Sequence, residues 1–218
     1  MRRILSCVLM MILPLCACTA AKQENPRQLA AAVRSDYLAM TSWRTSADIS
    51  AHYGDVVFEF SVEAQGEQGG ESSVTVTAPE SVAGITARIR KGEALLEYDG
   101  LGLSLGELDD SGLTPVSALP ALLKCLKEGY IADCAWSEAA DGRVLLLQCR
   151  DPRSDGGAGT GFDLYLDPVS HVPLRAEVSR DGVLVLAIKF DEFTMEMTND
   201  GTGTDEDLGR DRPGSSGA

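Results

Sequence analysis

The sequence contains few of the residues on which enzyme active sites most often depend. Only two of its 218 residues are histidines, His52 and His171, and histidine is the usual general base near neutral pH. No Ser-x-x-Lys, His-Glu-x-x-His or Walker-type phosphate motif is present. We therefore predict a protein with no catalytic residues and no cofactor, in which both histidines lie at the surface.

Basic residues are also scarce. The chain carries 19 Lys and Arg against 33 Asp and Glu, a formal net charge of −14 at pH 7. This excess would repel a phosphate backbone, which argues against nucleic acid as a partner. Hydrophobic residues make up 44% of the chain, which is enough for a globular core. The acidic residues are therefore expected to solvate the surface of a folded domain.

No apolar run is long enough to cross a membrane as a helix. The longest run, residues 4–15, would span about 18 Å as a helix, whereas a hydrocarbon core is about 30 Å thick. Arg2 and Arg3 precede this run. Positive residues followed by a short apolar stretch are typical of a secretory signal peptide, so we predict that this segment directs export.

The signal peptide ends in Leu-Cys-Ala-Cys (residues 15–18), which resembles a bacterial lipobox. Cys18 is the better lipid acceptor because the small Ala17 precedes it, whereas the other cysteine follows a bulky leucine. We predict that residues 1–17 are removed, that Cys18 receives a diacylglyceryl group and that residues 18–25 form a spacer. The protein would then be anchored at the extracytoplasmic face of the cell membrane. An ordinary signal peptide with incidental cysteines is the alternative.

Residues 26–197 have the composition of one folded domain, whereas residues 198–218 do not. This tail is rich in glycine and acidic residues and contains one large apolar residue, Leu208. Such a composition cannot bury enough apolar surface to offset the conformational entropy lost on ordering. We therefore predict a disordered acidic tail.

Two segments have the period of an amphipathic helix. The second covers residues 115–128 and stops at Gly129, a residue favoured just beyond helix ends. The first begins at Pro26, a favoured first-turn residue. Its apolar stripe consists of Leu29, Val33, Tyr37 and Met40, with Trp43 near the helix end.

Elsewhere, apolar residues alternate with polar ones, which is typical of strands with one dry and one wet face. The alternation begins at about Thr45 and recurs over residues 55–64, 73–78, 85–89, 94–98, 101–105 and 162–166. We predict an α+β, mainly β fold: a single curved antiparallel sheet, an incomplete barrel of about ten or eleven strands. The N-terminal helix and the second helix would lie as a lid on its concave face.

Three cysteines lie in the predicted domain, and outside the cytoplasm a disulfide is allowed. A tight turn at residues 141–142 would place Cys134 opposite Cys149 as a hydrogen-bonded pair, a geometry that suits a disulfide less well. Cys125, at the end of the second helix, can instead reach either one, and three buried thiols are equally compatible with the sequence. Spacings of 9 and 15 residues do not match a zinc site, so we predict no metal.

The apolar face of the sheet is the candidate binding site. If the helices leave it partly uncovered, it would offer a hydrophobic cavity to an acyl chain or to the side chains of a partner. A filled core covered by the helices is the alternative. The residues expected to line this face are Val56, Phe58, Phe60, Val62, Val74, Val76, Ile85, Ile89, Leu96 and Tyr98.

The carboxy-terminal part of the domain resembles the lipoprotein-carrier family of LolA and LolB. The similar features are a strand ending in Asp-Pro, a short turn to Val-Pro, and a hairpin ending in Phe-x-x-Phe (residues 162–174 and 181–193). The opening helix, which ends in Met-Thr-Ser-Trp (residues 40–43), is also similar, so the resemblance covers residues 26–197. The Tyr53-Gly54 turn and the link at residues 79–84 look like the GerS-like branch of this group in Firmicutes.

The resemblance implies a curved, incomplete barrel closed by a helical lid, and a role in binding. Members of the family carry lipoproteins or lipids, or sense and scaffold envelope proteins, and none has catalytic residues to carry over. LolA carriers are soluble, so an anchor at Cys18 fits the LolB-like or GerS-like members better. The expected partner is a hydrophobic ligand, a lipoprotein or an envelope protein. The alternative is a GerS-like accessory subunit of an enzyme that modifies the cell wall or spore cortex.

Overall fold

The computed structural model describes residues 25–107, 111–140, 142–152 and 158–198. The predicted signal peptide and Cys18 lie outside the described residues, as do the spacer up to residue 24 and the tail from residue 199. The described residues form two helices, α1 (Pro26–Ala39) and α2 (Pro115–Glu128). They also form the strands β1 (Met40–Tyr53), β2 (Val56–Glu67), β3 (Glu71–Ala78), β4 (Thr86–Arg90), β5 (Glu93–Tyr98), β6 (Leu101–Glu107), β7 (Ile131–Ala139), β8 (Gly142–Arg150), β9 (Thr160–Leu166), β10 (Pro173–Arg180) and β11 (Val183–Met197).

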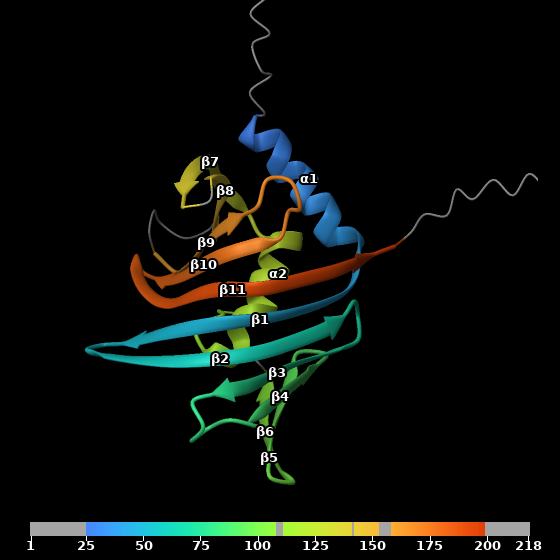
Figure 1. Cartoon of the computed structure of the whole chain (residues 1–218), viewed down its shortest axis with the longest axis vertical. Helices are drawn as coiled ribbons and strands as arrows, with labels where there is room; N and C mark the ends of the chain where they lie inside the picture. The colour runs from blue at the N-terminus through green and yellow to red at the C-terminus, as the bar shows by residue number, and fades with distance from the viewer. Residues whose placement is uncertain (1–24, 108–110, 141, 153–157, 199–218) are drawn as a thin grey trace, which may run out of the picture.

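All of these strands belong to one antiparallel sheet, in the order β6-β5-β4-β3-β2-β1-β11-β10-β9-β8-β7. The chain builds one half as a meander from β1 to β6, passes through α2, and returns from the opposite end until β11 pairs with β1. The sheet stays open, with β6 and β7 as its end strands in the described part of the chain (Figure 1). This arrangement confirms the predicted mainly β fold with one antiparallel sheet and two helices.

Helix α1 begins where the sequence predicts and ends earlier. The Asn25 side chain accepts a hydrogen bond from the Arg27 backbone amide at 3.0 Å, and a proline opens the first turn. Met40, expected on the helical stripe, instead begins β1 and pairs with Met197. The expectation that the strands begin near Thr45 is therefore wrong. Pairing with β2 on one side and β11 on the other extends the sheet back to the helix end.

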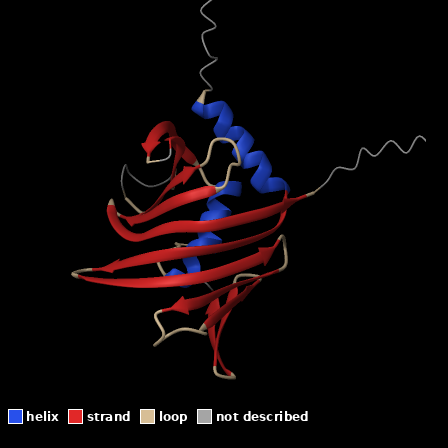
Figure 2. Ribbon diagram, viewed as in Figure 1, coloured by secondary structure: helices blue, strands red, loops and turns tan. Residues whose placement is uncertain are grey.

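Helix α2 has the predicted bounds and lies across one face of the sheet, called here the inner face (Figure 2). A reciprocal capping box between Thr114 and Ser117 starts the helix, and the Gly129 amide donates to the Cys125 carbonyl at 2.8 Å where it ends. Four of its leucines face strand residues, and only about 10 Å³ of space remains between them. The lining residues are Trp43, Thr45, Leu119, Leu122, Leu123, Leu126, Leu164, Pro173, Phe190 and Phe193.

Polar contacts attach α1 to the rest of the domain. The Tyr37 hydroxyl donates to the His171 carbonyl at 3.2 Å, and His171 Nδ1 lies 2.5 Å from an Asp36 carboxylate oxygen. Burial, together with the Asp36 charge, raises the pKa of Tyr37, so this hydroxyl remains a donor. Arg34 donates to the Leu126 carbonyl at 3.3 Å. These bonds connect α1 to the β9–β10 turn and to the end of α2.

The β7–β8 hairpin has a different register from the predicted one. Ala139 pairs with Gly142, so Gly142 belongs to strand β8 and not to the turn. Moving a turn by one residue moves every cross-strand partner by two. Cys134 therefore pairs with Leu147, and the prediction that it faces Cys149 is wrong.

Candidate functional site

The strand pairings show how the inner face continues beyond α2. Directly paired residues of antiparallel strands point to the same side of the sheet. One such row crosses five strand boundaries, from beneath α2 to the end strand, through Thr45, Ala64, Val74, Ala87, Leu96 and Leu103. Its first four residues are buried, Leu96 is half-buried, and Leu103 is 61% exposed. The inner face therefore opens to solvent toward β6.

The ten residues predicted to line the apolar face differ in the same way. Three of them are exposed: Val56, Phe58 and Tyr98. The buried ones are Val62, Val74 and Ile89, and the half-buried ones are Phe60, Val76, Ile85 and Leu96. The structure thus divides the set into a covered part, which belongs to the core, and an open part.

The exposed apolar residues of this side form what we call the open inner face: Tyr53, Val56, Phe58, Tyr98, Leu101 and Leu103. At the tip of the β1–β2 hairpin, the ring of Phe58 lies 6.3 Å from that of Tyr53 and 6.5 Å from that of Phe60. The Tyr53 hydroxyl donates to the Leu113 carbonyl at 3.2 Å, which holds the ring in place. In Figure 1, α2 crosses behind β11, β1 and β2, and β5 and β6 extend beyond it.

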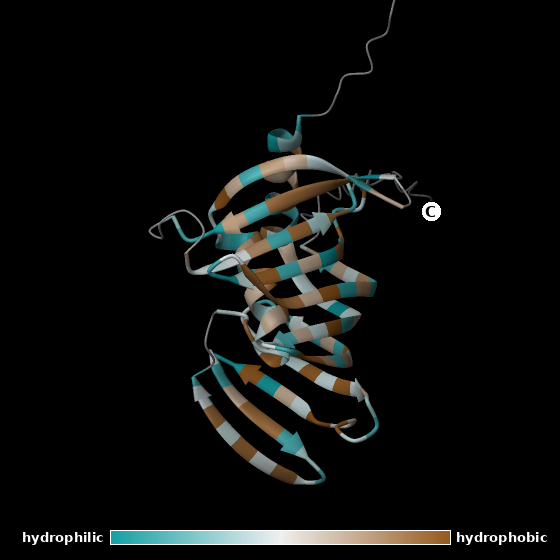
Figure 3. Ribbon diagram, turned by 90° about the vertical axis from the view of Figure 1, so that its left-hand side faces the viewer, coloured by the Kyte–Doolittle hydropathy of each residue, from teal (hydrophilic) through white to brown (hydrophobic). Residues whose placement is uncertain are grey.

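Sequence reasoning left the β6 residues out of the candidate site. Leu101, Leu103 and Leu105 are all exposed on this end strand, between two glycines and a serine. Figure 3 shows the alternation of hydrophobic and hydrophilic residues along the strands of this end of the sheet. Natural edge strands are usually protected by charges or prolines, and β6 has neither before Glu107. The sequence shows that this segment lacks charges and prolines. It does not show that β6 is the last strand of its half of the sheet.

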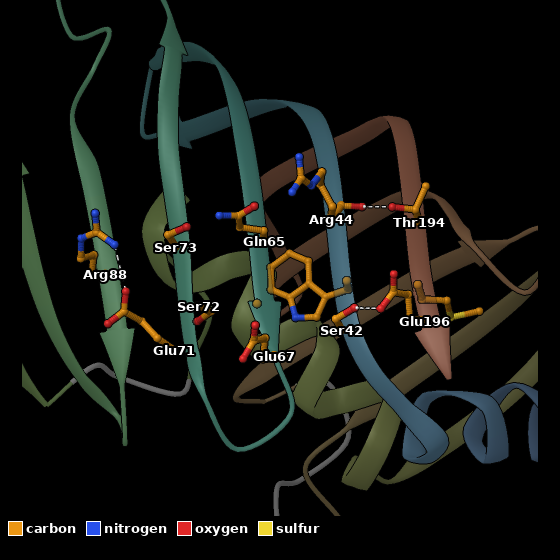
Figure 4. Close-up of a pocket in the computed structure, with 13 residues that line it drawn as sticks. Ser42, Arg44, Gln65, Glu67, Glu71, Ser72, Ser73, Arg88, Thr194 and Glu196 are labelled. Carbon is orange, nitrogen blue, oxygen red and sulfur yellow. Dashed lines mark hydrogen bonds and ion pairs between the residues drawn. The ribbon is translucent and has the colours of Figure 1, made fainter. Parts of the chain in front are cut away.

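A groove lies on the opposite side of the sheet, the outer face, across β11, β1, β2, β3 and β4 (Figure 4). It encloses about 540 Å³ and is lined mainly by polar and charged side chains. Many of these bond to one another: Ser42 donates to Glu196 at 2.9 Å, and Arg88 pairs with Glu71 at 2.9 Å. The groove therefore has the character of a solvated sheet surface, in contrast to the open inner face.

The described residues do not bring catalytic groups together. His52 lies on β1. The half-buried His171 contacts Asp36 at the end of a turn, and this contact attaches α1 to the turn; it does not place a general base beside a nucleophile. The described ranges contain no group of three or more His, Cys, Asp or Glu side chains that could hold a metal ion. Residues 102–106 do match the Gly-x-Ser-x-Gly pattern of hydrolases. They lie within strand β6, without the strand-to-helix turn that exposes a nucleophile.

Two further findings bear on the predicted sites. The three cysteines of the domain are present as thiols, with Cys125 and Cys149 buried and Cys134 half-buried. Neither helix in the part of the chain that the structure describes has the length and apolarity to span a bilayer.

No protein-family model matches the sequence, and no curated protein matches it. Solved structures do match. An uncharacterized conserved protein from Thermus thermophilus has 14% identity and a TM-score of 0.48, over 79% of this chain and 89% of that one. A LolA superfamily protein from Nitrosomonas europaea has 11% identity and a TM-score of 0.42, over 79% and 94%.

A third match is a chain in the structure of the CwlD amidase from Clostridioides difficile in complex with the GerS lipoprotein. Its identity is 12% and its TM-score 0.41, over 80% of this chain and 98% of that one. Each of these matches is a similarity at low sequence identity. With TM-scores below 0.5, they carry no argument about the activity, ligand or partner of this chain.

Proposed function

We propose that this protein is a non-catalytic binding protein, held at the extracytoplasmic face of the cell membrane by a diacylglyceryl group on Cys18, and that it binds an envelope protein through the open inner face. The observation that carries the proposal is the exposure of large apolar side chains on one side of the sheet, from Phe58 to Leu103. Exposed apolar clusters bordered by polar residues mark interaction sites.

A protein partner fits the described geometry better than an acyl chain does. A lipid carrier needs an enclosed apolar cavity of several hundred cubic ångströms. Between the leucines of α2 and the sheet residues that they face, only about 10 Å³ of space remains. The open pocket of about 610 Å³ at the end of α2 has charged residues in its lining, including Lys124, Glu128 and Arg150, and is not an enclosed apolar cavity. The open part presents aromatic and leucine side chains to solvent, as a protein interface does.

The charge of the chain narrows the class of partner. With a net charge of −14, the protein would repel an acidic surface, so the partner is expected to present an apolar segment with neutral or basic flanks. An accessory subunit that stabilises or positions a cell-wall enzyme, the second role that the resemblance implies, is one form of this proposal.

Capture from the native membrane tests the proposal. The full-length tagged protein would be solubilised in mild detergent, and co-purifying proteins and lipids would be identified by mass spectrometry. Leu103→Asp alters the open inner face, and Leu95→Asp is its control, since Leu95 is exposed on the opposite face of the neighbouring strand. We expect a protein retained by the wild type and by Leu95→Asp and lost from Leu103→Asp.

Two outcomes would contradict a protein partner. Recovery of lipid alone in near-equimolar amount would make the protein a lipid carrier. Recovery of neither a protein nor a lipid, with the anchor intact, would exclude both binding roles.

The proposed anchor makes a separate prediction. Replacing Cys18 with serine removes the thiol that would carry the diacylglyceryl group. We expect Cys18→Ser to move the protein from the membrane to the soluble fraction, because the described part of the chain contains no helix that could span the bilayer. Cell fractionation measures this, with Cys16→Ser as the control that stays at the membrane. If Cys18→Ser also stays membrane-bound, Cys18 is not the anchor.

A further inference from the structure

Two of the three cysteines are neighbours across the helix–sheet contact. Cys125 lies in the last turn of α2, and Cys149 lies near the end of β8. Both side chains are buried in the same core cluster, and each thiol acts on the pKa of the other. The two residues also line the same open pocket of about 610 Å³, through which a small reactant can approach.

The third cysteine is not placed in the same way. Cys134 lies on β7 opposite Leu147, and the direct partner of Cys149 on that strand is Ile131. Cys134 and Cys149 are therefore diagonal neighbours, and such residues lie about 7–8 Å apart, farther than the Cα atoms of most disulfides. The helix end is therefore the better partner for Cys149, which resolves the choice that the sequence left open.

The two thiols of the pair differ in pKa, although the positive charges of Arg34 and Arg150 act on both. The hydrogen bond from Cys125 and the positive charges of Arg34 and Arg150 lower the pKa of Cys149, and they outweigh its burial and the nearby Asp163 carboxylate. The same hydrogen bond, together with burial, raises the pKa of Cys125. Since the thiolate is the nucleophile in thiol–disulfide exchange, Cys149 is the first to react.

We propose that Cys125 and Cys149 form a disulfide that fastens the end of α2 to β8 once the protein has been exported. The oxidant is the disulfide of an extracytoplasmic thiol oxidase or of oxidised glutathione. The Cys149 thiolate attacks one sulfur of that disulfide, forms a mixed disulfide and releases one thiolate. Cys125 then loses its proton and attacks Cys149 Sγ, which releases the second thiolate. The pair loses two electrons and two protons, and the oxidant's disulfide is reduced to two thiols.

This bond would fix the helix that covers the filled part of the inner face. It would also close a loop of the chain between α2 and β8, which lowers the conformational entropy of the unfolded state. It does not depend on the proposed partner or on the anchor, because it rests on the position of two side chains within the core.

Peptide mapping of the full-length exported protein, purified without reductant and alkylated in denaturant, tests the proposal. We expect the Cys125 peptide to be linked to the Cys149 peptide, and Cys134 to be alkylated. Adding reductant should lower the melting temperature by roughly 6–12 °C. Cys134→Ser should preserve both results, and the double variant Cys125→Ser, Cys149→Ser should melt at the same temperature with and without reductant.

Other outcomes would overturn the proposal. Alkylation of both Cys125 and Cys149 in the exported protein would show a reduced pair, and a link that involves Cys134 would show different connectivity. The mass measurement is made on the wild-type protein, so it remains decisive even if a serine variant fails to fold.

Discussion

Replacing Leu122 with alanine is expected to lower the free energy of unfolding by about 2–5 kcal/mol. Leu122 is 2% exposed on α2 and faces Trp43, Leu164 and other sheet residues across a contact with almost no free space. Removing its side chain loses the transfer free energy of the buried methyl groups and leaves a cavity that a close-packed core can fill only in part. Chemical denaturation monitored by tryptophan fluorescence measures the change.

Leu38→Ala is the matched control for this prediction. Leu38 is also a helical leucine, on α1, but it is 52% exposed. Its replacement should change the unfolding free energy by less than about 0.5 kcal/mol, as is usual for surface substitutions. Equal effects of the two substitutions would show that α2 does not pack on the sheet as the structure has it.

Replacing Phe58 with aspartate is expected to weaken partner binding by about 30-fold or more. Aromatic side chains at the centre of an interface commonly contribute about 2 kcal/mol, and 1.4 kcal/mol corresponds to a factor of ten. A charge at this position would also have to be desolvated in the complex. Once the captured partner has been purified, calorimetry or surface plasmon resonance measures the change in Kd.

Val57→Asp provides a closely matched control. Val57 and Phe58 are consecutive residues of β2, both are 48% exposed, and they point to opposite faces of the sheet. Both variants introduce the same charge one residue apart, so a general effect of charge or of strand stability would appear in both. A comparable loss of affinity in Val57→Asp would contradict binding through the open inner face.

The local signals of the sequence predicted the elements well. The bounds of α2 followed from Pro115, whose fixed φ suits a first turn, and from Gly129, where a Cβ would lie 2.6 Å from the Cys125 carbonyl oxygen. Three turns between strands likewise follow Gly-containing pairs, at residues 91–92, 99–100 and 181–182, whereas residues 141–142 do not form such a turn. At the hairpin tip of β10 and β11, Arg180 pairs with Val183, as a turn at residues 181–182 requires.

Errors arose where distant parts of the chain decide the outcome. Met40 follows a helical stripe, yet it joins β1 because β11, from the far end of the domain sequence, offers it a strand partner. The register of β7 and β8 depended on which of two adjacent positions forms the turn, and an alternating pattern cannot distinguish a shift that moves partners by two. Hydrogen-bonded pairing across the sheet overrides the local preference in both cases.

The sequence predicted which side of the sheet is apolar, but not which part of that side is exposed. Alternation assigned Val62 and Phe58 to the same side of β2, which the strand pairings support. Alternation cannot show how much of that face is covered, and in the structure Val62 is buried whereas Phe58 is exposed. The exposure of Leu101 and Leu103 likewise depends on the strand order, because β6 would be protected if another strand followed it.

Photocrosslinking in living cells shows which molecule contacts the open inner face. A photoreactive amino acid would replace Phe58 in the full-length anchored protein, and in a second sample it would replace Val57. We expect an adduct with one envelope protein from position 58 and little or none from position 57, since only position 58 lies on the open inner face. Equal adducts from both positions, or adducts with lipid alone from position 58, would contradict it.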